Sequence, residues 1–434
     1  MDEVAGERDN HQAAPAARPV PPGGRWQRTF AGVFSATLLC FLAIGAVLPI
    51  LPKYVSEELG AGNVAVGVVV GAFAISALVG RPVGGRLADR RGRRTVHMAG
   101  MAICVVAGLL LFLPFGVPGL IFARLVVGLG DGWVFTAGVT WIVDLSPEER
   151  RGQAIGMFGL AIWGGLTFGS VLGEGVYSLG GYDAVWALAA IAPLLGLLVA
   201  RTVPEAAPLR QPVNEELAAA ELGAAFAPQR AVVPGAPAAT HGFERWVPRE
   251  AWRPGAALAL ANIGYGTMAG FVVLLLDQQG IGHGATAFTV FAASVVTARL
   301  LLGRLPDIVG ARRTALGAGL VQGLGLVAVG LAQSLPAALA AAALMGTGMS
   351  LLFPSLALLV VDRVPDERRG AAMGAFTAFF DLGVGLGAPF AGLVASLAGG
   401  EYAVAFYVGG ACCVGGAVLG WFSTRGIQRE PVLA

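Results

Sequence analysis

The chain contains twelve apolar segments, each long enough to cross a lipid bilayer as a helix. A bilayer core takes ~20 mostly apolar residues in helical form. Such segments lie at about 30–52, 63–83, 95–115, 118–143, 153–177, 183–203, 254–276, 285–303, 313–333, 336–361, 371–398 and 402–423. Only 13% of the residues are charged and the mean hydropathy is +0.72, whereas soluble domains carry about 25% charged residues. We therefore predict an all-α integral membrane protein with twelve transmembrane helices.

The longest polar stretch divides these segments into two sets of six. It is rich in Ala and Pro with scattered charges, a composition typical of a linker. We predict a disordered cytoplasmic tail at 1–29, a six-helix half at 30–203, a cytoplasmic linker at 204–253, a second half at 254–423 and a cytoplasmic tail at 424–434. The first tail lacks the apolar core of a cleavable signal peptide.

The distribution of basic residues predicts the orientation of the chain. If both termini are cytoplasmic, Lys53 is external and Arg124 lies within a span, and the other 27 of the 29 basic residues lie on or near the cytoplasmic side. This asymmetry satisfies the positive-inside rule. We predict a multi-pass protein of the cytoplasmic membrane, surrounded by the lipid bilayer and monomeric. The net charge of +2 gives no support for a nucleic-acid partner.

The two halves are internal repeats that keep one register. The loop after the second segment reads GRLADRRGRR from Gly85, and the loop after the eighth reads GRLPDIVGARR from Gly303. The interval between these two glycines, which we call the repeat offset, also relates DLSPEERRG from Asp144 to DRVPDERRG from Asp362. It further pairs Gly156 with Gly374, Gly165 with Gly383 and Gly169 with Gly387. We predict two parallel six-helix repeats, related by an axis along the membrane normal.

With these motifs in place, residues 30–423 resemble the major facilitator superfamily of secondary transporters. The first loop matches the family motif G-x3-D-R-x-G-R-R, and the second loop is a weaker copy of it. The matching residues are Gly85, Asp89, Arg90, Gly92, Arg93 and Arg94, and then Gly303, Asp307 and Gly310. The resemblance implies that this loop acts as a cytoplasmic gate, and the clustered charges around Asp89 suit a latch between helix ends. The alternative is that the arginines serve only to orient the chain.

Two further motifs extend the resemblance. Arg124-x3-Gly128 is similar to the family's second motif, and the fifth segment has the glycine spacing of its antiporter signature. These glycines are Gly156, Gly165, Gly169 and Gly173, with Ser170 and Glu174 in place of the signature's Pro and last Gly. Within the superfamily the chain most resembles bacterial sugar- and drug-efflux-type members.

Ionisable residues inside the spans are candidates for coupling ion movement to transport. Each costs ~2.5–3.5 kcal/mol on insertion scales, so a functional role is the default hypothesis. Asp131 lies near the middle of the fourth segment and Asp381 well inside the eleventh, whereas Glu174 lies near the outer end of the fifth. Arg124 lies seven residues before Asp131, which is about two turns and one helix face. We predict that Asp131 or Asp381 binds protons or substrate and that Arg124 pairs with Asp131; a static pair or a helix-capping role is the alternative.

Four more side chains are candidates for lining a central cavity: Trp133, Trp163, Asn262 and Tyr265. Core packing or anchoring at the membrane interface explains any one of them equally well. We assign Gly156, Gly165, Gly169, Gly173, Gly383 and Gly387 to close helix packing.

The sequence favours a transporter over other membrane proteins. The four histidines, His11, His97, His241 and His283, lie outside the middle of every span, and no catalytic triad or ATP-binding loop is recognisable. We therefore expect no enzyme activity, no cofactor and no metal site. We predict a secondary active transporter of a small molecule, working by proton-coupled efflux (antiport) of a drug, sugar or natural product. Proton-coupled uptake of a nutrient is the alternative, followed by a transporter-like receptor.

Overall fold

The computed structural model describes residues 23–146, 151–205, 249–364 and 369–423, and this part of the chain is helical without strands. The helices of the first half are α1 (Gly23–Val47), α2 (Leu51–Lys53), the π-helix η1 (Tyr54–Glu58), α3 (Asn63–Arg91), α4 (Arg93–Leu110), α5 (Gly116–Leu145) and α6 (Arg151–Thr202). Those of the second half are α8 (Arg249–Gln278), α9 (Gly284–Leu302), α10 (Leu305–Val309), α11 (Ala311–Gly330), α12 (Leu335–Val361), α13 (Arg369–Leu397) and α14 (Tyr402–Ser423).

Helix α6 contains two membrane crossings. Its apolar part is 47 residues long, or about 70 Å at 1.5 Å per residue, which is more than twice the ~30 Å bilayer core. The helix breaks at Gly180 and Gly181, and Gly181 has φ 63°, a conformation that glycine adopts without steric cost. With its two arms counted separately, the 11 apolar segments of the described residues provide twelve crossings, confirming the predicted fold class.

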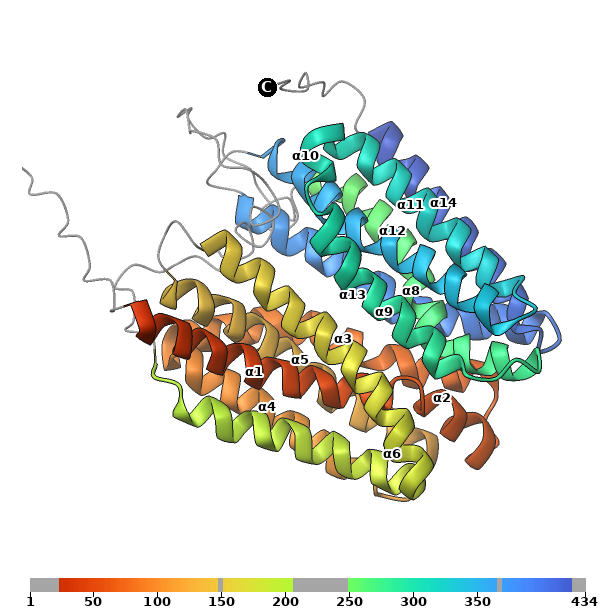
Figure 1. Cartoon of the computed structure of the whole chain (residues 1–434), viewed down its shortest axis with the longest axis horizontal. Coiled ribbons are helices and arrows are strands. Elements are labelled where there is room, and N and C mark those ends of the chain that lie inside the picture. The colour runs from red at the N-terminus through yellow and green to blue at the C-terminus, as the bar shows by residue number, and fades with distance from the viewer. Residues whose placement is uncertain (1–22, 147–150, 206–248, 365–368, 424–434) are drawn as a thin grey trace, which may run out of the picture.

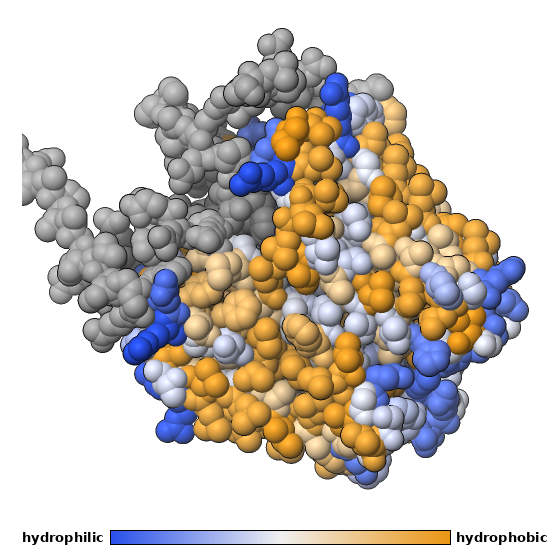
Figure 2. Space-filling model, in the orientation of Figure 1, coloured by the Kyte–Doolittle hydropathy of each residue, from blue (hydrophilic) through white to orange (hydrophobic). Residues whose placement is uncertain are grey.

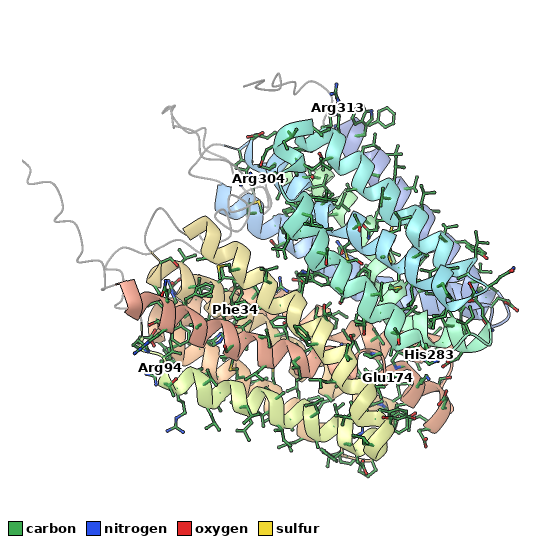
Figure 3. All side chains as sticks on the ribbon, in the orientation of Figure 1. Phe34, Arg94, Glu174, His283, Arg304 and Arg313 are labelled. Atoms are coloured by element: carbon green, nitrogen blue, oxygen red, sulfur yellow. The ribbon has the colours of Figure 1, made fainter. Side chains whose placement is uncertain are left out.

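The two halves lie side by side, the first coloured red to yellow-green and the second green to blue in Figure 1. The outer surface is apolar between two polar ends (Figure 2). Arg94, Arg304 and Arg313 lie at one end of the molecule, and Glu174 and His283 lie at the opposite end (Figure 3). The first end is the one that we predict to be cytoplasmic.

The helix boundaries differ from the sequence prediction at the start of each half. Helix α1 begins at Gly23 and α8 at Arg249, rather than at residues 30 and 254, because polar residues extend both helices beyond their apolar parts. Residues 1–22, most of the predicted linker (206–248) and the last tail (424–434) lie outside the described residues.

Glycines allow α6 to pack directly on the backbone of α1. A Cβ atom at Gly165, Gly169 or Gly173 would lie 2.7, 2.2 or 2.4 Å from a carbonyl oxygen of α1, which is too close for any side chain. In the second half, Gly383 and Gly387 make the same kind of contact between α13 and α8. Gly156 has open space where its Cβ would be, so this packing role does not extend to it.

The halves meet through contacts toward the end that carries Glu174 and His283 (Figure 3), which we predict to be the outer end. Helix α3 packs on α13, where a Cβ atom at Gly71 would lie 2.4 Å from the carbonyl oxygen of Gly385. Lys53 Nζ lies 3.0 Å from Asp277 Oδ2, and the Tyr402 hydroxyl lies 3.0 Å from Asn63 Oδ1. Ser170 and Thr289 join α6 to α9 through a hydroxyl–hydroxyl hydrogen bond of 2.7 Å.

Candidate functional site

A cavity of about 190 Å³ lies between the two halves, lined by residues of both. Much of its wall is aromatic: Phe41, Phe73, Phe135, Trp163, Tyr265, Phe353 and Phe380. Trp163 and Tyr265, from opposite halves, meet edge to face with 6.1 Å between ring centroids. Such a wall is suited to the flat or apolar body of an organic solute.

The charged part of the wall centres on Arg81 of α3. Its Nη2 lies 3.1 Å from Asp381 Oδ1 on α13 and 3.8 Å from Asp131 Oδ2 on α5. The Arg81 side chain is 18% exposed and the two carboxylates are 5% and 6% exposed. The guanidinium also lies 4.6 Å from the centroid of the Phe135 ring. One cation therefore joins an acid of its own half to an acid of the other half.

Arg124 does not form the predicted ion pair with Asp131. Two turns of helix separate the residues by about 10 Å along the axis, so sharing a helix face does not bring them into contact. Arg124 Nη2 instead donates to the Val70 carbonyl at 3.3 Å, and its guanidinium lies 4.8 Å from the centroid of the Phe73 ring. Arg81 occupies the position expected for Arg124.

Of the four predicted cavity residues, Trp163, Asn262 and Tyr265 line the cavity and Trp133 does not. Trp133 follows Asp131 by two residues, which is about 200° of helix rotation, so it points away from the cavity. It packs between α3 and α4, where Cβ atoms added at Gly84 and Gly100 would lie 2.8 and 3.0 Å from its side chain.

Two side-chain amides in the part of the cavity wall that comes from the second half have a defined orientation. Asn262 Nδ2 donates to the Leu258 carbonyl and Gln322 Nε2 to the Ala261 carbonyl, each at 2.9 Å. Because a carbonyl oxygen accepts only from the nitrogen of an amide, these bonds define the orientation of both groups. Both amides thus retain a carbonyl oxygen as an acceptor.

Sequence reasoning missed two cavity arginines, Arg81 and Arg299, by assigning them to the cytoplasmic side. Both line the cavity. They are also separated by the repeat offset, the interval from Gly85 to Gly303, so they occupy the same position in the second crossing of each half. This shared register was a signal in the sequence that could have identified them.

Glu174 lies away from the cavity. It is exposed at the outer end, and with Glu57 it contributes to the negative potential around Lys53. Lys53, the single lysine of the chain, pairs with Asp277 of the other half as described above.

The predicted gate residues of the first half make contacts within that half. Arg93 pairs with Asp89 and donates from Nε to Asp144 Oδ2 at 3.3 Å. The backbone N–H of Arg94 donates to Glu205 Oε1 at 3.0 Å. These bonds connect the ends of α3, α4 and α5 that lie near Arg94 to the segment directly after α6.

The second copy of the motif reproduces the backbone turn of the first. Gly92 and Gly310 immediately precede α4 and α11, and both have φ 96°, a conformation that favours glycine. Gly303 ends α9, and Asp307 lies in α10, where partial burial raises the pKa of its carboxyl above the ordinary value, opposed by Arg304. Arg90 and Gly85 lie on the last turns of α3, exposed and buried respectively.

Within residues 23–146, 151–205, 249–364 and 369–423, no cluster of three His, Cys, Asp or Glu side chains is arranged to hold a metal ion. His97, predicted to lie outside the middle of its span, is fully buried in α4, with Nδ1 3.0 Å from the Val134 carbonyl oxygen.

Twelve crossings in two six-helix halves, with a cavity between the halves, form the architecture of a large class of secondary transporters. The sequence profile of the Major Facilitator Superfamily matches residues 33–287 and 255–433. The chain belongs to this superfamily. It is therefore a multi-pass, non-enzymatic membrane transporter with a small-molecule substrate.

Known proteins similar to the chain agree with this assignment. It is 32% identical over 395 residues to STM4428 of Salmonella typhimurium, covering 89% of this chain and 94% of that protein. It is 30% identical over 394 residues to YhhS of Escherichia coli, covering 89% and 90%. Both relatives are described as uncharacterized MFS-type transporters.

Two solved structures share the fold. An auto-inhibited POT family peptide transporter superposes with a TM-score of 0.69 at 15% identity, covering 94% of this chain and 98% of that one. The human organic anion transporter MFSD10 superposes with a TM-score of 0.59 at 18% identity, covering 91% and 99%. At these identities the likeness extends to the fold alone.

Proposed function

We propose that the protein exports a small organic molecule from the cytoplasm in exchange for protons, by alternating access of the central cavity. The main support for this proposal is the group formed by Arg81, Asp131 and Asp381, which we call the Arg81 cluster. Arg81 and Asp131 belong to the first half and Asp381 to the second, and all three line the cavity. A proton on either carboxylate therefore changes the forces at the interface between the halves.

The two ion pairs have different consequences. Arg81 with Asp131 ties α3 to α5 inside one half, so it remains intact when the halves move as rigid bodies. Arg81 with Asp381 crosses between the halves. Protonation of Asp381 removes the charge that attracts Arg81, and the 3.1 Å contact loses most of its strength. Loading a proton on Asp381 thereby favours separation of the halves at this level.

The second carboxylate limits the cost of breaking this contact. Removing one partner of a buried ion pair typically costs about 3–5 kcal/mol because an uncompensated charge is left behind, and the cost here is below this range. Arg81 remains close to Asp131 after Asp381 is neutralised, so the guanidinium keeps a counterion throughout. The cluster can exchange one partner without leaving a lone buried cation.

Alternating access also requires that the inner side of the protein can close, and the loop motif between α3 and α4 is suited to this role. Asp89, Arg93 and Asp144 hold the ends of α3, α4 and α5 together. We propose that this assembly docks against the second half when the protein faces outward. In the orientation proposed from the arginine distribution, both termini lie in the cytoplasm.

Proton movement in vesicles containing the purified protein tests this function. A pH gradient is imposed and a panel of drugs, sugars and amphipathic acids is added one at a time. We expect a transported solute to collapse the gradient, and Asp381→Asn and Asp131→Asn to lose the response. Asp183→Asn, at an exposed outer position, is the matched control and should behave as the wild type.

Two outcomes would contradict the proposal. If solutes equilibrate without proton movement, the protein is a uniporter or uses another ion. If the solute and protons move in the same direction, with the solute entering from outside, the protein is an uptake system. Retained coupling in both aspartate variants would exclude the Arg81 cluster as the coupling group.

A further inference from the structure

We infer that the transported solute carries an N–H or O–H group, which donates hydrogen bonds to the side-chain oxygens of Gln322 and Asn262. This inference rests on the proposed transport function and adds the chemical class of the solute. It starts from one unpaired atom in the cavity wall. Gln322 lines the cavity and is 1% exposed, and its Oε1 has no hydrogen-bond partner among the described residues.

The neighbouring hydrogen bonds determine which amide atom of Gln322 is unpaired. Its Nε2 donates to the Ala261 carbonyl at 2.9 Å, so exchanging the two ends of the amide would bring two oxygens together. Asn262, the next residue of α8, also lines the cavity, and its Nδ2 donates to the Leu258 carbonyl at 2.9 Å. Both side chains therefore use a donor on the backbone of α8 and keep an acceptor oxygen.

Helix packing holds both amides in place. A Cβ atom at Gly348 of α12 would lie 2.4 Å from the backbone nitrogen of Gln322, and one at Gly383 of α13 would lie 2.8 Å from Asn262 Cβ. Contacts this close leave little room for the two residues to move. The acceptors are thus positioned before a ligand binds, which reduces the entropic cost of binding.

An unpaired acceptor inside a protein is unfavourable. Burial removes the hydrogen bonds that water would make, and a missing partner leaves this loss uncompensated. A leucine of comparable size would avoid the cost, because its side chain has no polar atom. The presence of an amide at position 322 is explained if its partner arrives with the solute. That partner must be a donor, since the amide oxygen can only accept.

The surrounding wall defines the body that carries the donor. Tyr265 follows Asn262 by three residues, which makes the two side chains neighbours on one face of α8. Tyr265 also meets Trp163 of the other half edge to face. A flat apolar body packed on these rings would bring a donor on its edge toward the amides. The solute class is therefore an aromatic molecule with an N–H or O–H group, such as an indole, a phenol or an aryl amide.

Two matched pairs of probes test the inference: indole with 1-methylindole, and 2-naphthol with 2-methoxynaphthalene. In each pair a methyl group replaces the donor hydrogen. Binding of the tritiated probes to the purified full-length protein in lipid nanodiscs is measured by scintillation proximity, independently of transport. The donor preference is the dissociation constant of the methylated probe divided by that of its partner. Gln322→Leu should reduce this ratio at least about tenfold, which is about 1.4 kcal/mol, and Asn262→Leu should reduce it as well.

Two further variants make the result specific. Gln322→Glu keeps an acceptor oxygen in either protonation state, so it should retain the donor preference and show that the loss in Gln322→Leu is not misfolding. Gln278 is an exposed amide outside the cavity that also donates to a backbone carbonyl, that of Gly400, at 3.0 Å. Gln278→Leu should therefore bind both probes of each pair as the wild type does.

Three results would overturn the inference. The first is an unchanged ratio in Gln322→Leu, which would mean that water alone occupies the acceptor. The second is loss of the donor preference in Gln322→Glu, and the third is the absence of binding by both donor probes. If Gln322→Leu binds neither probe of a pair, the ratio in Asn262→Leu decides in its place.

The outcomes also separate this inference from the proposed function. Donor-dependent binding without proton movement in vesicles would support the solute class and refute proton coupling. Proton movement driven by a solute without an N–H or O–H group, at the same rate in the wild type and in Gln322→Leu, would support the transport function and refute the solute class.

Discussion

The ion pair between Lys53 and Asp277 is predicted to hold the outer side of the protein closed. Lys53 lies between α1 and α3 and Asp277 near the end of α8, so the pair joins the two halves. Its atoms are 3.0 Å apart, and the side chains are 25% and 34% exposed. Opening the outer side separates the halves at this level and breaks the pair.

The exposure of both side chains sets the size of the expected effect. Ion pairs that are accessible to water contribute about 0.2–1 kcal/mol, which corresponds to a change of about 1.4- to 5-fold in a two-state equilibrium. Lys53→Ala should therefore increase the outward-open population by a factor in this range. Asp277→Ala should give a similar shift, because either change removes the same contact.

Distances between spin labels at Ser178 and Glu401 can measure this shift. Both positions are exposed at the outer side, one in each half, and the native cysteines are replaced by alanine. The single variants should raise the long-distance population, and the exchanged pair Lys53→Asp with Asp277→Lys should partly reverse it. Reversal is incomplete because Glu57 and Glu174 also act electrostatically at the Lys53 position. Unchanged distances in both single variants, or no reversal in the exchanged pair, would refute the reasoning.

Two other predictions concern the interface between the halves and the cavity wall. Gly71→Val should reduce transport by tenfold or more by blocking outer closure, because its Cβ would lie 2.4 Å from a carbonyl oxygen of α13. The control is Gly164→Ala, whose Cβ meets open space. Equal transport rates in the two variants would contradict the packing role of Gly71. Trp163→Ala should weaken solute binding by about 1.5–3 kcal/mol, the range for burial of a large apolar side chain. Trp133→Phe should change thermal stability more than binding, and a larger loss of affinity in Trp133→Phe than in Trp163→Ala would mean that the cavity wall is misassigned.

Features that depend only on order and spacing along the chain could be predicted without a structure. The length and polarity of each segment decide whether it can cross a bilayer, so the twelve crossings follow from composition alone. The constant repeat offset revealed the two halves and the equivalence of the two loop motifs. The depth of Asp131 and Asp381 in the membrane could also be predicted, because it follows from the number of residues between each aspartate and the ends of its span.

Tertiary structure decided which of the candidate side chains meet. Asp131 and Asp381 lie in different halves of the sequence and share one partner, Arg81, only because α3, α5 and α13 converge on the cavity. The Trp133 side chain faces away from the cavity because the packing of α5 against α3 and α4 fixes the rotation of α5 about its axis. That rotation decides which residues of α5 face the cavity. Spacing along the chain gives depth in the membrane, whereas contact across the cavity depends on how the helices rotate and pack, and twelve helices allow many arrangements of the same segments.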